Sequence, residues 1–329
     1  MIVFIVQHCD SLFHSITVQL RGTEIRLNLN SRWALSGITV AGGHGEDNRL
    51  NQLCNPFGLY VDVDQNIYVT DYNNHWIVEW KCGATSGQVI AGGHGAGNRM
   101  DQLDRPTDVI VDEATNNLFI CDSGNRRIVR WPRRDGTHGE TIMSNISCWG
   151  LTKDDRGYLY VSDEKENSVK RWRIGDTTDK IVAGGNGEGS RLDQLNHPSY
   201  IFVDQNYSVY VSDNRNHRAM KWKKDATEGI VVAGGRGQGN GLTHMNSPCG
   251  IVVDQLSTVY VAECSNHRVM RWPKGATQGI ALVDGNSTRD PAKCLSYPWG
   301  LSFDRHGNLY VVDKDNQRVQ KFTIDQSTC

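Results

Sequence analysis

The sequence predicts an all-β protein, a six-bladed β-propeller built from four-stranded antiparallel blades. A phrase that ends in an aromatic residue recurs, with spacings of 51, 41, 50, 50 and 50 residues between successive aromatics. The segments before these aromatics alternate apolar and polar residues, as half-buried strands do. The 34 glycines and 9 tryptophans among 329 residues suit many short strands joined by tight turns. The recurring aromatics are Trp80, Trp131, Trp172, Trp222, Trp272 and Phe322.

One unit of the repeat shows the expected strands in order. A first strand starts at Pro248 in "PCGIVVD", where the proline cannot donate to a β-ladder. "STVYVAE" and "HRVMRW" alternate as second and third strands, and "GIALVDG" at residue 279 is a fourth. Four antiparallel strands repeated about every 50 residues are typical of a propeller blade.

The strand count predicts how the ring closes. The first three strands occur six times, but the fourth follows only five of them, and its missing copy is "GITVAGG" at residues 37–43. We therefore expect the strand at 37–43 to join the C-terminal blade, which removes both exposed edges of the ring. Residues 33–329 then form one domain, and residues 1–32 are predicted to be a disordered or poorly packed leader.

The repeats resemble those of the NHL-repeat family. The resemblance rests on the turn written Asn74-His75, Asn216-His217-Arg218 and Asn266-His267-Arg268, on the preceding "YVxD", and on the "P-x-G" opening. It covers residues 37–323 and implies a six-bladed propeller. It implies no single function, because relatives are similar to RNA-binding modules, to sensor domains and to the lyase that completes peptide amidation.

The third repeat departs from this pattern. It is about nine residues shorter than the others and has Cys148 in place of the proline. It also has Glu166-Asn167-Ser168 where other repeats have Asn-His-Arg. We expect the blade to form with different loops.

The acid and the amide of each turn, such as Asp213 and Asn216, are interpreted as structural. Because the acid and the amide occur in nearly every blade, we expect them to stabilise the hairpin between second and third strands and to pair with the following arginine. His75, His217 and His267 are spread around the ring and cannot converge on one ion. The glycine-rich "AGGHGEDNRL" at residue 41 lacks the nine-residue period of calcium-binding rolls, so we expect it to serve turns between blades.

The channel mouth is the predicted binding site. The first strand of each blade should line the central channel, and the residues just after each proline differ between repeats. Aromatic side chains with scattered polar groups suit a binding pocket. The candidate rim residues are Phe57, Thr107, Asp108, Trp149, Ser199, Tyr200, Cys249 and Trp299.

The favoured function is a non-catalytic recognition or scaffold module that binds a peptide, protein or glycan through this mouth. A metal-dependent lyase or hydrolase, similar to the peptide-amidating lyase, is the alternative. Zinc needs three convergent protein ligands, whereas the rim offers one carboxylate, Asp108, and His197 stands alone beside Pro198. We therefore predict no metal, no cofactor and no catalytic residue.

RNA binding is a third hypothesis. Basic residues interleave with tryptophan on the third strands, as in "RRIVRWPRR" from Arg126. A net charge of −2 argues against a dominant polyanionic partner. No run is long enough to span a membrane, and a monomer is expected.

The nine cysteines show no zinc-module spacing. Cys82 and Cys121 lie in neighbouring repeats, so a disulfide between them is one hypothesis; the other is that most cysteines are small buried apolar side chains. The sequons at Asn145, Asn206 and Asn286 favour an extracellular location slightly.

Overall fold

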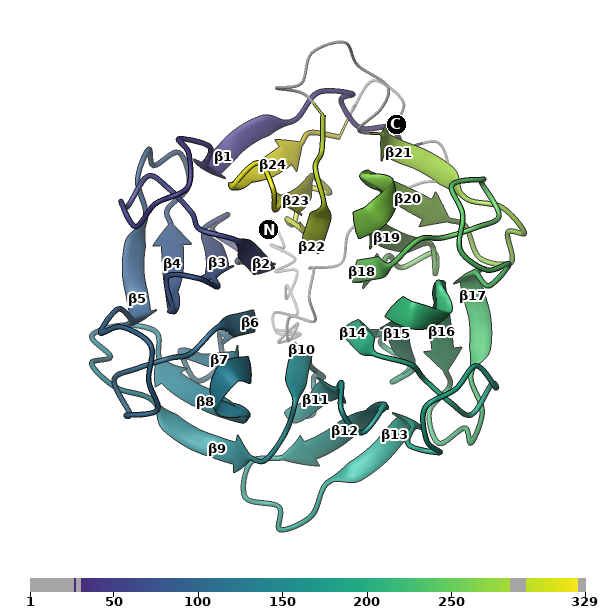
Figure 1. Cartoon of the computed structure of the whole chain (residues 1–329), viewed down its shortest axis with the longest axis horizontal. Coiled ribbons are helices and arrows are strands. Elements are labelled where there is room, and N and C mark those ends of the chain that lie inside the picture. Colours follow the sequence, from purple (N-terminus) through teal and green to yellow (C-terminus); the bar gives the residue numbers. More distant parts are fainter. Residues whose placement is uncertain (1–26, 28–30, 285–293, 325–329) are drawn as a thin grey trace, which may run out of the picture.

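The computed structural model describes residues 27, 31–284 and 294–324. These residues form 24 strands in six four-stranded antiparallel sheets, arranged as blades around a central axis (Figure 1). The all-β, six-bladed propeller predicted from the repeat is confirmed.

The first three blades are formed by the strands from β2 to β13. Blade 1 contains β2 (Pro56–Val61), β3 (Ile67–Asp71), β4 (Trp76–Trp80) and β5 (Gln88–Gly92). Blade 2 contains β6 (Pro106–Asp112), β7 (Asn117–Asp122), β8 (Arg127–Pro132) and β9 (Glu140–Ser144). Blade 3 contains β10 (Cys148–Lys153), β11 (Tyr158–Asp163), β12 (Ser168–Arg173) and β13 (Lys180–Gly184), so the divergent repeat does form a blade.

The last three blades complete the ring. Blade 4 contains β14 (Pro198–Val203), β15 (Val209–Asp213), β16 (Arg218–Trp222) and β17 (Ile230–Gly234). Blade 5 contains β18 (Pro248–Val253), β19 (Val259–Glu263), β20 (Arg268–Trp272) and β21 (Ile280–Asp284). Blade 6 contains β22 (Pro298–Phe303), β23 (Leu309–Asp313), β24 (Arg318–Phe322) and the N-terminal β1 (Ile38–Gly42).

The pairing of β1 with β24 closes the ring. The two strands are antiparallel, with Ile38 opposite Lys321 and Gly42 opposite Arg318. A further bridge joins Trp33 to Ile324. The predicted exchange of the strand at 37–43 into the C-terminal blade is therefore confirmed, and no sheet of the described residues is left with three strands.

Residues before β1 also pack against the ring. The Trp33 indole donates to the carbonyl oxygen of Gly307 at 2.9 Å and lies 5.8 Å from the Tyr260 ring. Leu27 and Ser31 are buried. The rest of the predicted leader, 1–26 and 28–30, lies outside the described residues, as does the sequon at Asn286.

The third-strand aromatics form the core between blades. Trp80, Trp131, Trp222, Trp272 and Phe322 are each at most 2% exposed. The second-strand tyrosines are buried beside them and donate their hydroxyls to the acid at the end of the first strand, as from Tyr260 to Asp254 at 3.0 Å. Burial and the Asp254 charge raise the pKa of Tyr260, which keeps this phenol a donor.

The acid and amide of each turn hold the hairpin, as predicted. In blade 4, Asp213 accepts from the backbone N–H of Asn196 at 2.7 Å, from the Asn216 amide at 2.8 Å and from Arg218 Nε at 2.7 Å. The rest of the Arg218 guanidinium donates to carbonyl oxygens of the preceding loop, at Ser190, Arg191 and Gln194. Blade 1 differs, because the Trp76 indole replaces the arginine and donates to Asp71 at 2.8 Å.

Two disulfides are formed in the described residues. Cys121 on β7 bonds with Cys148 on β10, which ties blade 2 to blade 3. Cys249 on β18 bonds with Cys264 in the turn after β19, within blade 5. The hypothesis of a Cys82–Cys121 bond is wrong, because Cys82 lies exposed after β4, while Cys121 faces the neighbouring inner strand that carries Cys148.

Candidate functional site

The six inner strands β2, β6, β10, β14, β18 and β22 surround the centre of the ring (Figure 1). They approach closely where the "P-x-G" glycines lie. A Cβ atom on Gly58 would stand 2.7 Å from the Thr107 carbonyl oxygen, and one on Gly300 would stand 2.6 Å from the Phe57 carbonyl oxygen. This close approach fixes the neighbouring side chains at one mouth of the channel.

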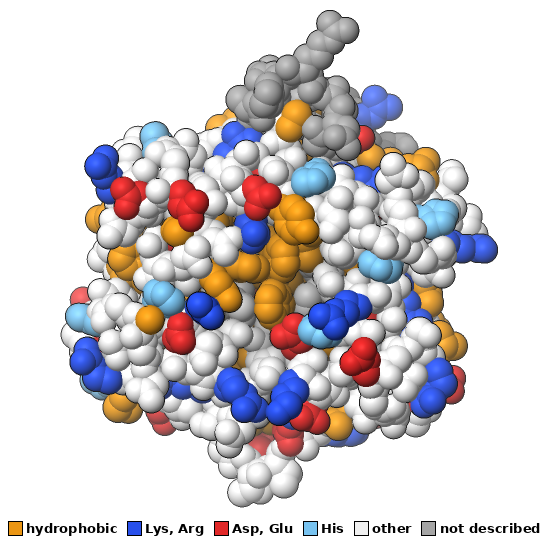
Figure 2. Space-filling view, viewed as in Figure 1, with side chains coloured by type: hydrophobic (Ala, Val, Ile, Leu, Met, Phe, Trp, Pro, Cys, Tyr) orange, Lys and Arg blue, Asp and Glu red, His pale blue; other side chains and the backbone are white. Residues whose placement is uncertain are grey.

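Three of the predicted rim residues come together at this mouth. Phe57 of blade 1 lies 4.7 Å from Trp299 of blade 6, measured between ring centroids. Trp149 of blade 3, on the other side of the ring, lies 5.8 Å from Phe57 and 6.0 Å from Trp299. Apolar side chains gather in the hollow at the centre of the face shown in Figure 2. The channel mouth therefore carries an aromatic cluster contributed by three separate blades.

Sequence reasoning missed three further members of this cluster. Tyr72 lies 4.6 Å from Phe57, and Tyr297 stacks on Trp299 at 6.4 Å with only 16° between the planes. The third member is Lys314. Tyr72 and Lys314 both follow the acid of the "YVxD" phrase directly, so the repeat register itself could have placed them at the same mouth.

The ammonium of Lys314 lies among the rings. Its Nζ is 5.5 Å from the centroid of Phe57, 5.4 Å from Tyr297 and 5.9 Å from Trp299, which are cation–π distances. The side chain is only 17% exposed, and its carboxylate partner Asp315, at 3.3 Å, is 47% exposed. The cluster thus holds a partly desolvated positive charge.

Two indole N–H groups add hydrogen-bond donors to the cluster. Nε1 of Trp149 and Nε1 of Trp299 are buried, and neither has a hydrogen-bond partner among the described residues. An indole N–H can only donate, and a buried donor without an acceptor is unfavourable. With Lys314, the cluster contains three donor groups, of which the two indole N–H groups are buried.

The other five predicted rim residues are buried and serve the ring itself. Thr107 donates to the Cys148 carbonyl oxygen at 3.3 Å, and Asp108 accepts from the backbone N–H of Leu151 at 2.7 Å. Ser199 donates to the Pro248 carbonyl oxygen at 3.2 Å, and the Tyr200 hydroxyl donates to the Thr107 carbonyl oxygen at 2.9 Å. Cys249 is in a disulfide. The polar atoms of Thr107, Asp108 and Ser199 join neighbouring inner strands, and the Tyr200 hydroxyl reaches from blade 4 to blade 2.

His197 was predicted to stand alone, and it does not. Its Nδ1 lies 2.6 Å from the Glu164 carboxylate, at the start of the turn after β11. Both side chains are about one third exposed. Glu164 holds the same repeat position in blade 3 that Lys314 holds in blade 6, so the mouth is acidic at one side and basic at the other.

Comparison with known proteins identifies NHL repeats in two of the blades. A model of the NHL repeat matches residues 53–80 and 295–322, which lie in blades 1 and 6. The chain is a six-bladed β-propeller that contains NHL repeats. A search of curated protein sequences finds no match for it.

Solved structures similar to this NHL propeller share its fold at low identity. An auxiliary nutrient binding protein from Bacteroides thetaiotaomicron is 13% identical, with a TM-score of 0.69 over 90% of this chain and 78% of that chain. Virginiamycin B lyase from Staphylococcus aureus is 12% identical, with a TM-score of 0.54 over 85% and 98%. A chain of a nidogen/laminin complex is 19% identical, with a TM-score of 0.55 over 83% and 86%.

The basic third strands of the NHL propeller are mostly engaged within the protein. Arg127, Arg218 and Arg268 bind the turn acids and are nearly buried. Arg133 pairs with Asp62 and Glu113, and Lys170 pairs with Asp163. Fewer arginine and lysine side chains are therefore free to bind a polyanion than the sequence suggests.

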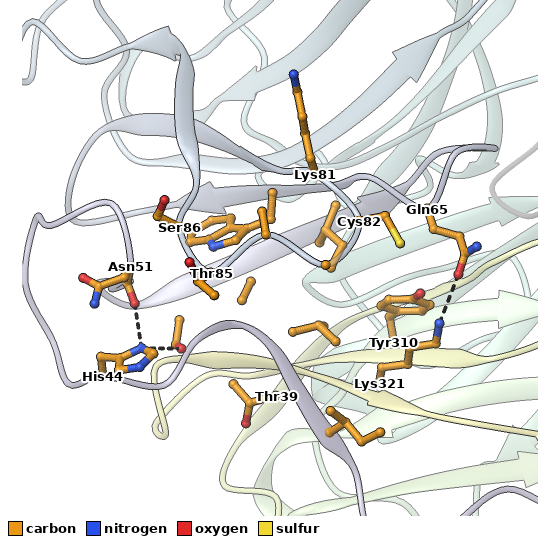
Figure 3. Close-up of a pocket in the computed structure, with 18 of the residues that line it drawn as sticks. Thr39, His44, Asn51, Gln65, Lys81, Cys82, Thr85, Ser86, Tyr310 and Lys321 are labelled. Carbon is orange, nitrogen blue, oxygen red and sulfur yellow. Dashed lines mark hydrogen bonds between the residues drawn. The ribbon is translucent and has the colours of Figure 1, made fainter.

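A groove lies on the outer side of the NHL propeller, where the closing blade meets blade 1 (Figure 3). It encloses about 890 Å³ between β1 and the turn 81–86. Lys321 crosses it to donate to Gln65 at 3.1 Å, and the exposed Cys82 forms part of its wall. Its walls are more apolar than polar, with Ile38 60% exposed and Leu50 47% exposed.

Among the described residues, no group of three or more His, Cys, Asp or Glu side chains is placed to hold a metal ion. Within the same residues, no helix has both the length and the apolar character needed to cross a membrane.

Proposed function

We propose that this NHL propeller is a recognition module that binds a peptide, protein or glycan at the channel mouth through Phe57, Trp149 and Trp299. The observation that carries the proposal is the convergence of these three rings from three blades, with centroids 4.7–6.0 Å apart. Aromatic side chains that cluster in a hollow with a few polar groups are typical of binding sites.

The repeat itself supports a functional reading of these positions. In the other blades the same inner-strand position holds the smaller side chains of Thr107, Ser199 and Cys249. Thr107 and Ser199 donate to carbonyl oxygens of the next inner strand, and Cys249 is in a disulfide. The ring can therefore form without aromatic side chains at this position. The large rings in blades 1, 3 and 6 are not needed for closure of the fold, which favours a ligand as the reason for them.

The fold neighbours are compatible with this proposal. One is described as a nutrient binding protein, and another comes from a complex of nidogen with laminin. A third is a lyase, so the fold alone does not choose between binding and catalysis.

A display selection tests the proposal. A peptide library is selected on the wild-type protein, and the enriched pool is then measured against Trp149→Ala and Trp299→Ala. Leu50→Ala is the matched control, because it removes an exposed apolar side chain at the outer groove instead of the mouth. We expect the two mouth variants to lose at least about tenfold in affinity, as central aromatic anchors do, and Leu50→Ala to bind as the wild type does. Equal binding by all four proteins contradicts the proposal.

A further inference from the structure

We propose that the mouth recognises a carboxylate on an acidic peptide segment, held by Lys314 and by the indole N–H groups of Trp149 and Trp299. The inference rests on the proposed recognition function and adds to it the chemistry of the ligand. It follows from the kinds of polar group at the mouth, from their burial and from the angles between the rings.

The charge of Lys314 is the first argument. An ammonium has three donor hydrogens, and that of Lys314 has a single carboxylate partner among the described residues, the half-exposed Asp315 at 3.3 Å. Because the Lys314 side chain is only 17% exposed, water screens its charge less than at an open surface. A ligand carboxylate would meet this ammonium at the edge of the aromatic floor.

The indole groups are the second argument. Nε1 of Trp149 and Nε1 of Trp299 are buried donors that the described residues leave without an acceptor. A carboxylate offers only acceptors, with about four lone-pair sites, so it matches a set of donors. A neutral sugar brings hydroxyl donors as well as acceptors, and these donors need acceptors, whereas the carboxylates of Asp315 and Glu164 at this mouth are already paired with Lys314 and His197.

The ring angles favour a peptide over a sugar acid. Phe57 meets Trp299 at 78° and Trp149 at 84°, so these rings pack edge to face on one another. A sugar ring stacks on one flat, open aromatic face, whereas edge-to-face rings surround a narrow side chain. Only Tyr297 and Trp299 are close to parallel, at 16°.

Matched peptide pools test the inference. Three fluorescent heptapeptide pools share the same random apolar positions and differ at two fixed positions, which carry Glu, Gln or Lys. A glucuronic acid oligomer serves as the sugar-acid probe. Anisotropy titrations compare the wild type with Lys314→Met, which keeps the length of the side chain and removes its charge. Lys223→Met is the control, because it makes the same change at an exposed lysine directly after β16.

We expect the wild type to bind the Glu pool roughly tenfold more tightly than the Gln pool, because one charge-assisted hydrogen bond is lost with Gln. Lys314→Met should abolish that preference, and Lys223→Met should keep it. Trp299→Phe keeps an aromatic ring and removes the N–H, so it should weaken the Glu pool more than the Gln pool.

Each contrary result has one meaning. Equal affinity for the Glu and Gln pools, with loss of both in Trp299→Ala, overturns the carboxylate and leaves the recognition function standing. Tighter, Lys314-dependent binding of the glucuronic acid oligomer overturns the peptide. Binding that Trp299→Ala leaves unchanged, or no binding of any probe, overturns the mouth as the recognition site and the inference with it.

Discussion

The Nδ1 atom of His217 in blade 4 accepts a hydrogen bond from the backbone N–H of Ser247, which lies 3.2 Å away at the start of blade 5. His267 and Tyr297 repeat this bond between blades 5 and 6, at 3.1 Å. At the closing junction the acceptor is the Gln317 side chain, which takes the backbone N–H of Asn55 at 2.6 Å. The histidine of the NHL turn therefore accepts a hydrogen bond that links one blade to the next.

This bond predicts a loss of stability in acid. Nδ1 of His217 can accept only while the ring is neutral, and burial lowers the pKa of His217 against the opposing effect of Asp213. A group with a lowered folded pKa contributes its stability above its unfolded pKa, about 6.5 for histidine, and the contribution is lost as the pH falls below that value.

His217→Gln should keep the bond, as Gln317 does, without the titration. Urea unfolding at pH 8 should give the same stability as the wild type, and the loss between pH 7 and pH 5 should be smaller in the variant. His94→Gln, at an exposed ring, is the control and should change neither value. An unchanged acid loss in His217→Gln would show that this histidine is not the sensitive group.

The turn acid should contribute far more to the free energy of unfolding than an acid on the surface does. Asp213→Ala leaves Arg218 buried, at 7% side-chain exposure, without its carboxylate. Breaking a buried ion pair in this way costs about 3–5 kcal/mol of unfolding free energy. Asp193→Ala removes a partly exposed carboxylate whose partner Arg191 is 66% exposed, and it should have no measurable effect. Similar urea midpoints for the two variants would contradict the structural role.

Blade 1 lacks the arginine of the turn, and this predicts a stabilising change. Burial raises the pKa of Asp71 to about 6 against the lowering effect of its hydrogen bonds, among them the one from the Trp76 indole, which carries no positive charge. With the folded pKa raised, ionisation of Asp71 costs stability as the pH rises through about 6.

Trp76→Arg supplies the missing charge and favours the ionised carboxylate. The unfolding free energy of the variant relative to wild type should be about 1 kcal/mol more favourable at pH 7.5 than at pH 5. Urea titrations at both pH values measure it. If the variant and the wild type differ in unfolding free energy by the same amount at pH 5 and at pH 7.5, the guanidinium does not reach Asp71.

The bond between Cys121 and Cys148 should stabilise the contact of blades 2 and 3. It closes 27 residues of chain, for which the entropic account gives about 3.5 kcal/mol. Cys148→Ala should lose that amount in urea unfolding without reductant, and Cys82→Ser should lose nothing. Mass mapping of the alkylated wild type should recover Cys121 and Cys148 as one linked peptide; two separately alkylated cysteines would exclude the bond.

The repeat predicts the fold because short-range sequence patterns mark each strand of each blade. Pro248, the alternation to Trp272, and the surplus strand at 37–43 fix strand order and closure without any knowledge of long-range contacts. The partners of the turn acids follow for the same reason.

The site is less predictable, because an irregularity follows each first-strand proline. The register shifts between Pro298 and Leu301, and likewise between Pro198 and Ile201, so simple alternation does not tell which side chains face the channel. Thr107, Ser199 and Tyr200 are therefore buried, as is the Phe57 ring beneath the cluster, whereas Trp149 and Trp299 are only partly buried. Lys314 stands in a turn that the sequence suggests is solvated, and only the folded ring places it among the aromatics.

The indole resonances of the nine tryptophans in a ¹⁵N–¹H spectrum test the central claim most directly. Trp149→Phe and Trp299→Phe assign the two mouth resonances, and Trp272, whose buried Nε1 also has no partner among the described residues, is the internal reference. Addition of a peptide pool that binds the protein should move the Trp149 and Trp299 signals and leave that of Trp272 in place. Movement of other indole signals, with those of Trp149 and Trp299 unchanged, would contradict recognition at the channel mouth.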